Sequence, residues 1–468
     1  MPNVVVWEDD PGSQLGYIQV PAPDLSQPSL ALKITNPGQQ PAARLYDAGT
    51  AEFRYWDSSA ALLRAATYWS AIIPEGTTWE PGSPLAVILD GGEDLNAFYD
   101  RQALNFFHGS GADGNPVFSG ESPDVVCHEL GHAVLDSIRP ELFNAMSLEI
   151  PAFHESFGDM SSILSALQVP GVRDAVLRET NGHIDHTSSL SRLAEQLGTA
   201  IRAQAPDAVD PDCLRNAANS FFYQDPENLP SSAPASMLAQ EPHSFSRVFT
   251  GAFLEALAGM LLTVSPNNPT SADLLNVSTS MGRLLVAAAQ SAPAVPEFYS
   301  QAALALIQAD AQNGGQFGAP LKSAFVRRGI LATQTASAVG TMRTAMIAAP
   351  AGMAAVARGA SRMRELPLQA IDATQYGLTA PLFVHAPAQP RSFTALAAGP
   401  AGGTVSPTSS DRAARIFVEH LMRLGRVDFG SHAGPGSIVH PRARKTHMIE
   451  RLDSGALVLR RKLFYCWR

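Results

Sequence analysis

Hydrophobic residues near the start of the chain fall in short runs separated by turn-forming residues. Residues 30–34 and 51–55 are strand-like, and so is the run 84–89, which is bounded by proline and an Asp-Gly-Gly turn. Between them, residues 58–73 repeat apolar positions every three or four residues. This spacing predicts a helix capped by Ser58 or Ser59. The first 120 residues are therefore expected to be rich in strands.

From residue 122 onward, helical spacing dominates. A glycine-rich stretch, expected to be a loop, leads into Ser122-Pro123-Asp124. This triplet favours a helix start, with serine as cap and proline at the first helical position. The predicted helices are 123–139, 151–168, 188–204, 244–263, 271–291, 296–310 and 319–330.

The amino-acid composition changes near residue 333, where alanine, glycine, proline and serine become frequent. We therefore expect a Pro-rich extension over residues 1–30, a main body over 31–332, a linker region over 333–410 and a small α/β segment over 411–468. Further elements predicted beyond the main body are an Ala-rich helix at 340–364, a helix at 411–424 and a β-hairpin formed by 448–452 and 456–464.

Composition excludes several classes of protein. The 468 residues carry a formal net charge of −10 without a basic cluster, which argues against a nucleic-acid partner. The three cysteines contain no CxxC pair, so neither a disulfide framework nor a cysteine zinc site is indicated. Unbroken apolar runs are too short for a transmembrane span, and the richest stretch, 249–264, is expected to be a buried helix.

The candidate chemistry lies in the HExxH sequence His128-Glu129-Leu130-Gly131-His132. On a helix, residues four apart share a face, so both imidazoles reach one metal ion while Glu129 lies beside it as a general base. HExxH also occurs by chance on core helices, so a third ligand is needed to decide.

Glu155 is the best candidate for that third ligand. The metzincin pattern is excluded, because Leu135 and Ile138 occupy its Gly and third-ligand positions. Glu155 lies on the next predicted helix, with Asp159 one turn later. Asp159 can therefore accept a hydrogen bond from a ligand imidazole, on the ring nitrogen that does not bind the metal. Glu149 and His154 remain rival ligands, although neither has a carboxylate one turn on.

Several motifs together resemble the thermolysin family of zinc metallopeptidases. DVVCHELGHAV (124–134) is similar to that family's metal helix. AFHESFGDM (152–160) is similar to its second motif, with His154 in place of an asparagine and Gly158 in place of a serine. Asn96-Ala97 resembles the segment that holds substrate backbone. Arg215 and His243 resemble the substrate-binding arginine and the catalytic histidine, and the motifs cover about residues 30–332 in the family's order.

The resemblance implies an α+β catalytic domain with two lobes, a strand-rich N-terminal lobe and a helical C-terminal lobe, followed here by an additional C-terminal region. It implies a zinc endopeptidase that hydrolyses peptide or protein substrates. The implied roles are His128, His132 and Glu155 as zinc ligands, Glu129 and His243 as catalytic residues, Asp159 behind a ligand, and Asn96, Ala97 and Arg215 as substrate-binding residues.

The chain also departs from that family. It lacks a tyrosine between His132 and Glu155, and the carboxylate that orients the catalytic histidine has only Glu241 as a nearby counterpart. Asp124 matches a calcium ligand, but its acidic companions are reduced to Asp174 and Glu179. Calcium therefore has much less support than zinc.

Two alternatives follow from these departures: a protease-like binding module with weak or no activity, and an effector protease directed at one host protein. The first residues lack a basic segment followed by an apolar one, so no ordinary signal peptide is predicted. A processed or shortened chain, a cytoplasmic location and a non-standard export route would each account for this, whereas the family is usually secreted.

Overall fold

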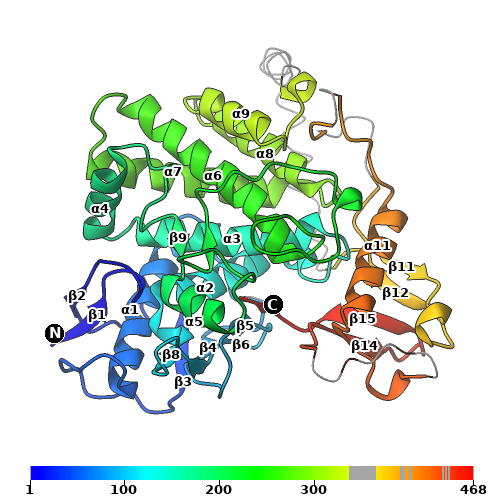
Figure 1. Cartoon of the computed structure of the whole chain (residues 1–468), viewed down its shortest axis with the longest axis horizontal. Coiled ribbons are helices and arrows are strands. Elements are labelled where there is room, and N and C mark those ends of the chain that lie inside the picture. The colour runs from blue at the N-terminus through cyan, green and yellow to red at the C-terminus, as the bar shows by residue number, and fades with distance from the viewer. Residues whose placement is uncertain are drawn as a thin grey trace.

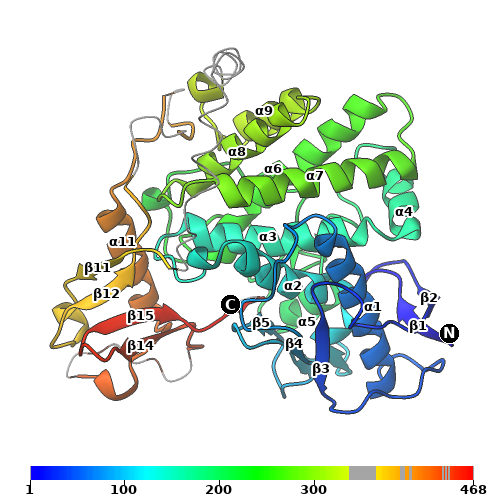
Figure 2. The same cartoon turned by 180° about the vertical axis from the view of Figure 1, so that it is seen from behind.

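The computed structural model describes residues 2–336, 365–389, 396–399, 403–434, 437, 440 and 443–466. They form a mixed α/β structure with several small sheets, which is compatible with the expected α+β class. Figure 1 shows the later helices of the main body, in green, on one side and the first strands and helix, in blue, on the other, with a smaller unit in orange and red beside the body. From that unit the red chain returns to the centre of the body, and the reverse view in Figure 2 shows the same path.

Helix α1 (Ala51–Ser70) begins seven residues before the predicted helix. Thr50 caps it, because its hydroxyl accepts a hydrogen bond from the Phe53 N–H (3.2 Å). Phe53 and Trp56 are buried three residues apart, a helical spacing. The prediction of a strand over residues 51–55 was therefore wrong.

The first residues of the chain pack against α1. β1 (Asn3–Trp7) and β2 (Tyr17–Pro21) form an antiparallel pair, and Val4 and Val6 are buried in the same core as α1. The Trp7 N–H donates to Asp57 of α1 (2.7 Å). Part of the segment expected to be an extension thus belongs to the body.

A five-stranded sheet lies beside the HExxH motif, in the order β16-β5-β6-β4-β3. β3, β4 and β6 are parallel, β5 is antiparallel to β6, and β16 is antiparallel to β5. Strands predicted near residues 30–34 and 84–89 are confirmed, whereas β16 comes from far along the chain. The bounds are Leu32–Asn36 (β3), Leu85–Ile88 (β4), Ala97–Tyr99 (β5), Ala103–Phe106 (β6) and Phe464–Tyr465 (β16).

Two buried helices carry the HExxH motif and the second motif. α2 (Pro123–Ile138) begins as predicted, with the Ser122 hydroxyl accepting from the Val125 N–H (3.3 Å). It packs closely against α3 (Glu149–Ala166) at two glycines. A Cβ on Gly131 would lie 2.7 Å from the Ser161 Cβ, and a Cβ on Gly158 would lie 2.6 Å from the His128 ring. Glycine at both positions is what allows the helices to bring their side chains to one point.

The remaining helices of the body follow the predictions with two exceptions. Helix 188–204 was predicted too long, because Ala194 adopts a left-handed conformation (φ 53°) and its N–H donates to Asp124 (3.0 Å). A helix starting at Pro170 was missed. The helices are Pro170–Thr180 (α4), Glu195–Gln204 (α5), Pro242–Val264 (α6), Ser271–Ser291 (α7), Phe298–Gln312 (α8) and Gly318–Arg327 (α9), with the short pair β9 (Arg192–Leu193) and β10 (Arg215–Asn216) between α4 and α6.

Among the described residues, α6 is the one helix long and apolar enough to cross a membrane. It is mostly buried inside the body, as a core helix is, so it gives no clear transmembrane segment.

The smaller unit is a second five-stranded sheet with α11 (Ser410–Arg423). The predicted hairpin is confirmed as β14 and β15, and the helix at 411–424 is confirmed as α11. Two strands of the sheet, β11 and β12, come from the segment expected to be a linker, while the predicted helix 340–364 lies outside the described residues. The strands span Leu368–Ile371 (β11), Leu382–His385 (β12), Val427–Asp428 (β13), His447–Arg451 (β14) and Leu457–Arg461 (β15).

Candidate metal centre

Two imidazole nitrogens and one carboxylate oxygen lie close together between α2 and α3. Nε2 of His128 lies 3.5 Å from Oε2 of Glu155, and Nε2 of His132 lies 3.8 Å from the same oxygen. All three atoms are buried and have no hydrogen-bond partner. Donors around a tetrahedral zinc ion are about 3.3–3.6 Å apart, given the usual bond lengths. Buried polar atoms without partners are costly, so this set fits a metal ion with little adjustment.

The other ring nitrogen of each histidine has its own partner. Nδ1 of His128 lies 3.1 Å from Oδ1 of Asp159, and Nδ1 of His132 lies 3.2 Å from Nδ1 of His154. Since a carboxylate only accepts, the His128 proton belongs on Nδ1, which leaves the lone pair of Nε2 facing Glu155. His154, a rival ligand by sequence, thus lies behind His132 instead.

Asp159 is itself fixed by other side chains. Its Oδ1 accepts hydrogen bonds from Nε (3.2 Å) and Nη2 (2.8 Å) of Arg215, and its Oδ2 accepts from the Thr250 hydroxyl (3.2 Å). Burial would raise the pKa of Asp159, but the charges of Arg215 and His128 outweigh burial and hold it well below its usual value. Asp159 is therefore ionised and keeps its orienting role over the whole working pH range.

Without a metal ion the two histidines titrate differently. Burial lowers the pKa of His132 well below its usual value, helped by the nearby charge of His128. Burial acts the same way on His128, but the nearby carboxylates of Asp159 and Glu155 outweigh burial and raise its pKa to about 9. Metal binding must therefore displace a proton from His128, as is general for imidazole ligands.

Glu129 lies on the same helix and is fully buried, with no partner for either carboxylate oxygen. Burial raises its pKa to about 8. A divalent cation at the neighbouring donors would favour its charged form. The arrangement places a carboxylate that can gain and lose a proton beside the metal donors.

His243 and Glu241 form a second pair at the centre, where Nε2 of His243 lies 3.4 Å from Oε2 of Glu155. His243 is in the first turn of α6, and its Nδ1 lies 2.6 Å from Oε1 of Glu241. Burial lowers the pKa of His243, but Glu155 and Glu241 outweigh burial and raise it. Glu241, which the sequence offered only as a nearby residue, orients His243 and leaves its Nε2 to donate.

The three residues predicted to bind substrate backbone also gather here, and they already have a peptide partner. We call residues 464–466 the inserted segment: β16 pairs with β5, and Cys466 follows it. The Cys466 N–H donates to the Ala97 carbonyl (2.9 Å) and to Oδ1 of Asn96 (3.2 Å). Nη1 of Arg215 donates to the Cys466 carbonyl (2.8 Å). The structure thus gathers the predicted site residues around one point, next to the inserted segment.

No protein-family model matches this chain, and no curated protein matches it. The proposals that follow therefore depend on the geometry of this centre and on the motifs of its sequence.

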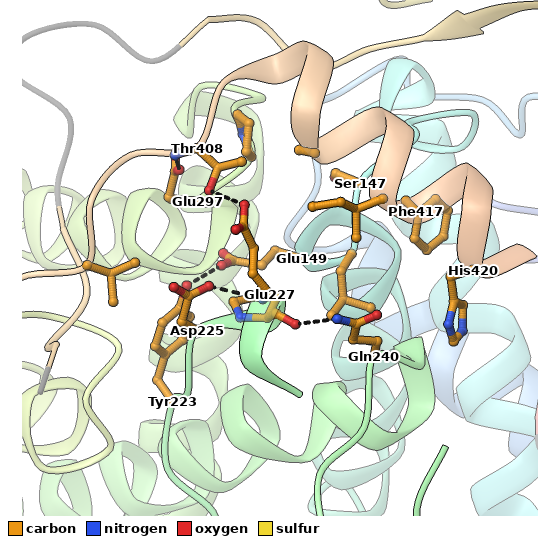
Figure 3. A pocket seen from close by; sticks show the side chains of 16 residues that line it. Ser147, Glu149, Tyr223, Asp225, Glu227, Gln240, Glu297, Thr408, Phe417 and His420 are labelled. Atoms are coloured by element: carbon orange, nitrogen blue, oxygen red, sulfur yellow. Dashed lines mark hydrogen bonds between the residues drawn. The ribbon is translucent and has the colours of Figure 1, made fainter. Parts of the chain in front are cut away.

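Glu149, the other rival ligand, points elsewhere. Its Oε1 accepts from the Tyr223 hydroxyl (2.6 Å) and its Oε2 from the Tyr299 N–H (2.7 Å). Figure 3 shows it in a pocket between α11 and the body, among further carboxylates such as Asp225 and Glu297. Its oxygens are already satisfied, so Glu155 is the carboxylate available to a metal.

The acidic neighbours of Asp124 are not those that the sequence suggested. Asp9, Asp10 and Glu195 surround it and, together with burial, raise its pKa well above the usual value. Glu179 instead accepts from the Ser189 N–H (2.8 Å). Among the described residues, the groups with metal-ligand spacing lie at the centre around His128, so calcium stays an unsupported expectation.

Sequence reasoning missed Cys466 and Phe464. The Cys466 sulfur lies within 4.8 Å of a His128 ring nitrogen and a Glu129 oxygen. The Phe464 ring stacks on His132 and on His154, with centroids 4.8 and 4.2 Å apart. An aromatic-aromatic-cysteine sequence after a predicted hairpin gave no sign of this contact, which joins residues more than 300 positions apart.

Asp159→Asn should lower zinc affinity by about 10–100-fold, the usual effect of losing the partner behind a ligand. Asparagine keeps the size of the side chain but no longer fixes the proton on Nδ1 of His128. Zinc affinity can be measured by competition with a chromophoric chelator. Thr250→Val is the matched control, because it removes only the partner of Oδ2, and it should bind zinc almost normally. Equal affinities for all three proteins would mean that Asp159 does not orient the ligand.

Proposed function

We propose that the protein is a zinc-dependent endopeptidase with a two-lobed, thermolysin-like catalytic domain. The observation that carries this proposal is the set of three unpartnered donors on His128, His132 and Glu155, with the unpartnered carboxylate of Glu129 beside them. Two imidazoles and one carboxylate are a usual ligand set for catalytic zinc, which keeps a further position open. The lobe with the five-stranded sheet and α2 and the helical lobe with Arg215 and His243 would form the two sides of the cleft.

Zinc in this position would polarise the peptide carbonyl and make a water molecule more acidic. Glu129 takes the proton from that water as it attacks the carbonyl carbon, and then gives the proton to the leaving nitrogen. Burial suits this role, because it brings the affinity of the Glu129 carboxylate for a proton into the neutral range.

The other groups bind and polarise the substrate. Nε2 of His243, oriented by Glu241, donates to the carbonyl oxygen where negative charge develops. Asn96 and Ala97 accept from the peptide N–H groups along β5, and Arg215 donates to the following carbonyl. An extended peptide that adds a strand to the β5 edge satisfies all of these groups at once.

The proposal predicts zinc-dependent hydrolysis once the cleft is free of the inserted segment. A chain ending at Lys462 should bind about one zinc ion and cleave a quenched peptide library. Chelation should abolish cleavage and added zinc should restore it. Circular dichroism and zinc content confirm that the shortened chain is folded.

The competing function is a protein that binds peptides without cutting them, which the filled cleft favours. If the folded, zinc-loaded chain ending at Lys462 binds peptides but cleaves none in the library, that function replaces the one proposed here.

A further inference from the structure

The inserted segment extends the central sheet at its open edge. β16 pairs antiparallel with β5, with Phe464 opposite Tyr99 and Tyr465 opposite Phe98. Phe464 and Cys466 are 1% exposed and Tyr465 is 6% exposed, so this is an inserted strand and not a surface contact. Edge strands offer free backbone groups to another chain, and here the same chain takes them.

The segment contacts the catalytic groups in the way expected of a substrate. Nε2 of His243 hydrogen-bonds to the Tyr465 carbonyl oxygen, while Asn96 and Ala97 accept from the Cys466 N–H. The peptide bond between Tyr465 and Cys466 therefore has its oxygen at the oxyanion donor and its nitrogen at the backbone acceptors. Arg215 holds the next carbonyl, that of Cys466.

The Cys466 thiol lies beside Glu129 and one of the histidine donors. Its sulfur is within 4.8 Å of both a His128 nitrogen and a Glu129 oxygen. A sulfur atom this close to both groups takes up space that a water molecule beside Glu129 would need. The aromatic ring of Phe464, stacked on His132 and His154, further fixes the strand.

We infer that the inserted segment is an internal pseudo-substrate, held along β5 so that it excludes both peptides and the catalytic water. The inference rests on the proposed endopeptidase function, of which it describes the regulation. The protein is then inactive while residues 464–466 stay in place, and it becomes active when they leave. The occupant of the open cleft is an extended peptide that pairs antiparallel with β5.

A peptide-binding experiment tests this without relying on turnover. The probe is a fluorescein-labelled Leu-Phe-Tyr-Ser amide, which copies residues 463–466 with serine for cysteine. Two zinc-loaded chains carrying Glu129→Gln are compared, one ending at Lys462 and its matched control ending at Cys466. We expect at least 10-fold tighter binding by the chain ending at Lys462, measured by fluorescence anisotropy. Equal affinity in the two chains overturns the inference.

Thiol labelling of the intact chain is the second test, and it needs no variant that could misfold. Cys466 should react slowly with iodoacetamide, and an excess of unlabelled probe peptide should accelerate its reaction several-fold by displacing the segment. Cys127, buried in α2, is the internal control and should not respond. Labelling of Cys466 that is fast from the start and insensitive to peptide overturns the inference.

The two proposals fail in different ways. The chain ending at Lys462 could bind the probe tightly and yet hydrolyse no peptide when Glu129 is intact. That result rejects the endopeptidase but keeps the inference that the inserted segment occupies the peptide-binding site. Equal hydrolysis by the full chain and by the chain ending at Lys462 keeps the endopeptidase and rejects the internal pseudo-substrate.

Discussion

Glu129→Gln is expected to reduce peptide hydrolysis by about 10²–10⁴-fold, the usual contribution of a positioned acid–base group, while zinc content stays near one per chain. Glutamine keeps the size of the side chain but cannot take a proton from water. Glutamate and glutamine at position 129 should be compared in the chain ending at Lys462, which lacks the inserted segment. Zinc content and turnover should be measured on the same preparation.

A matched control for Glu129→Gln is Glu141→Gln. Glu141 follows α2 and pairs with Arg139 (2.6 Å), away from the metal donors. It should leave turnover unchanged. Loss of zinc from Glu129→Gln would make Glu129 a ligand, and undiminished turnover would move the chemistry to another residue.

Glu155→Ala should have the largest effect on the metal itself. It removes one of the three proposed ligands, so we expect zinc affinity to fall by more than about 100-fold. That loss exceeds the effect of removing a partner that only orients a ligand. Two imidazoles on one helix then remain as the only protein ligands. The measurement is zinc content after dialysis against a weak chelator, together with affinity by competition.

Glu149→Ala is the control for this second variant, because Glu149 is also a buried glutamate of α3 but accepts from Tyr223 and Tyr299. It should keep its zinc. If Glu149→Ala loses zinc and Glu155→Ala keeps it, the assignment of the third ligand is reversed.

The parts of the site that were predictable depend on local spacing. His128 and His132 had to share a face of one helix, and the Ser122 cap with Pro123 located the start of that helix. Glu155 was preferred because Asp159 follows one turn later. In the structure both carboxylates face the ring of His128, Glu155 at Nε2 and Asp159 at Nδ1. Such relations span one or two helical turns, where chain geometry leaves few alternatives.

Two predictions of secondary structure were wrong because local signals in the sequence were weighed incorrectly. Residues 51–55 resembled a strand because aromatic residues favour strands, yet Thr50 caps a helix there. The start of α4 was marked by Pro170, a usual first helical residue, and was overlooked.

The inserted segment could not be predicted for a different reason. Its contacts join Cys466 to Asn96, Ala97 and Arg215, and no local pattern specifies which distant strand completes a sheet edge. The strand at 382–385 was hidden in the same way, since its partner β15 lies more than 70 residues later. The strand at 368–371 joins the sheet only by pairing with it.

During synthesis, the residues of the candidate metal centre are made well before the inserted segment that covers them. The proposed metal ligands, Glu129 and His243 all precede residue 332, whereas the inserted segment ends at residue 466, 134 residues later. At about 5–20 residues per second, a ribosome needs roughly 7–27 s to make that stretch. The nascent body therefore has several seconds in which the proposed zinc site is formed but not yet covered by the inserted segment. During that interval the growing chain, and any extended chain nearby, is exposed to a centre that the finished protein keeps covered.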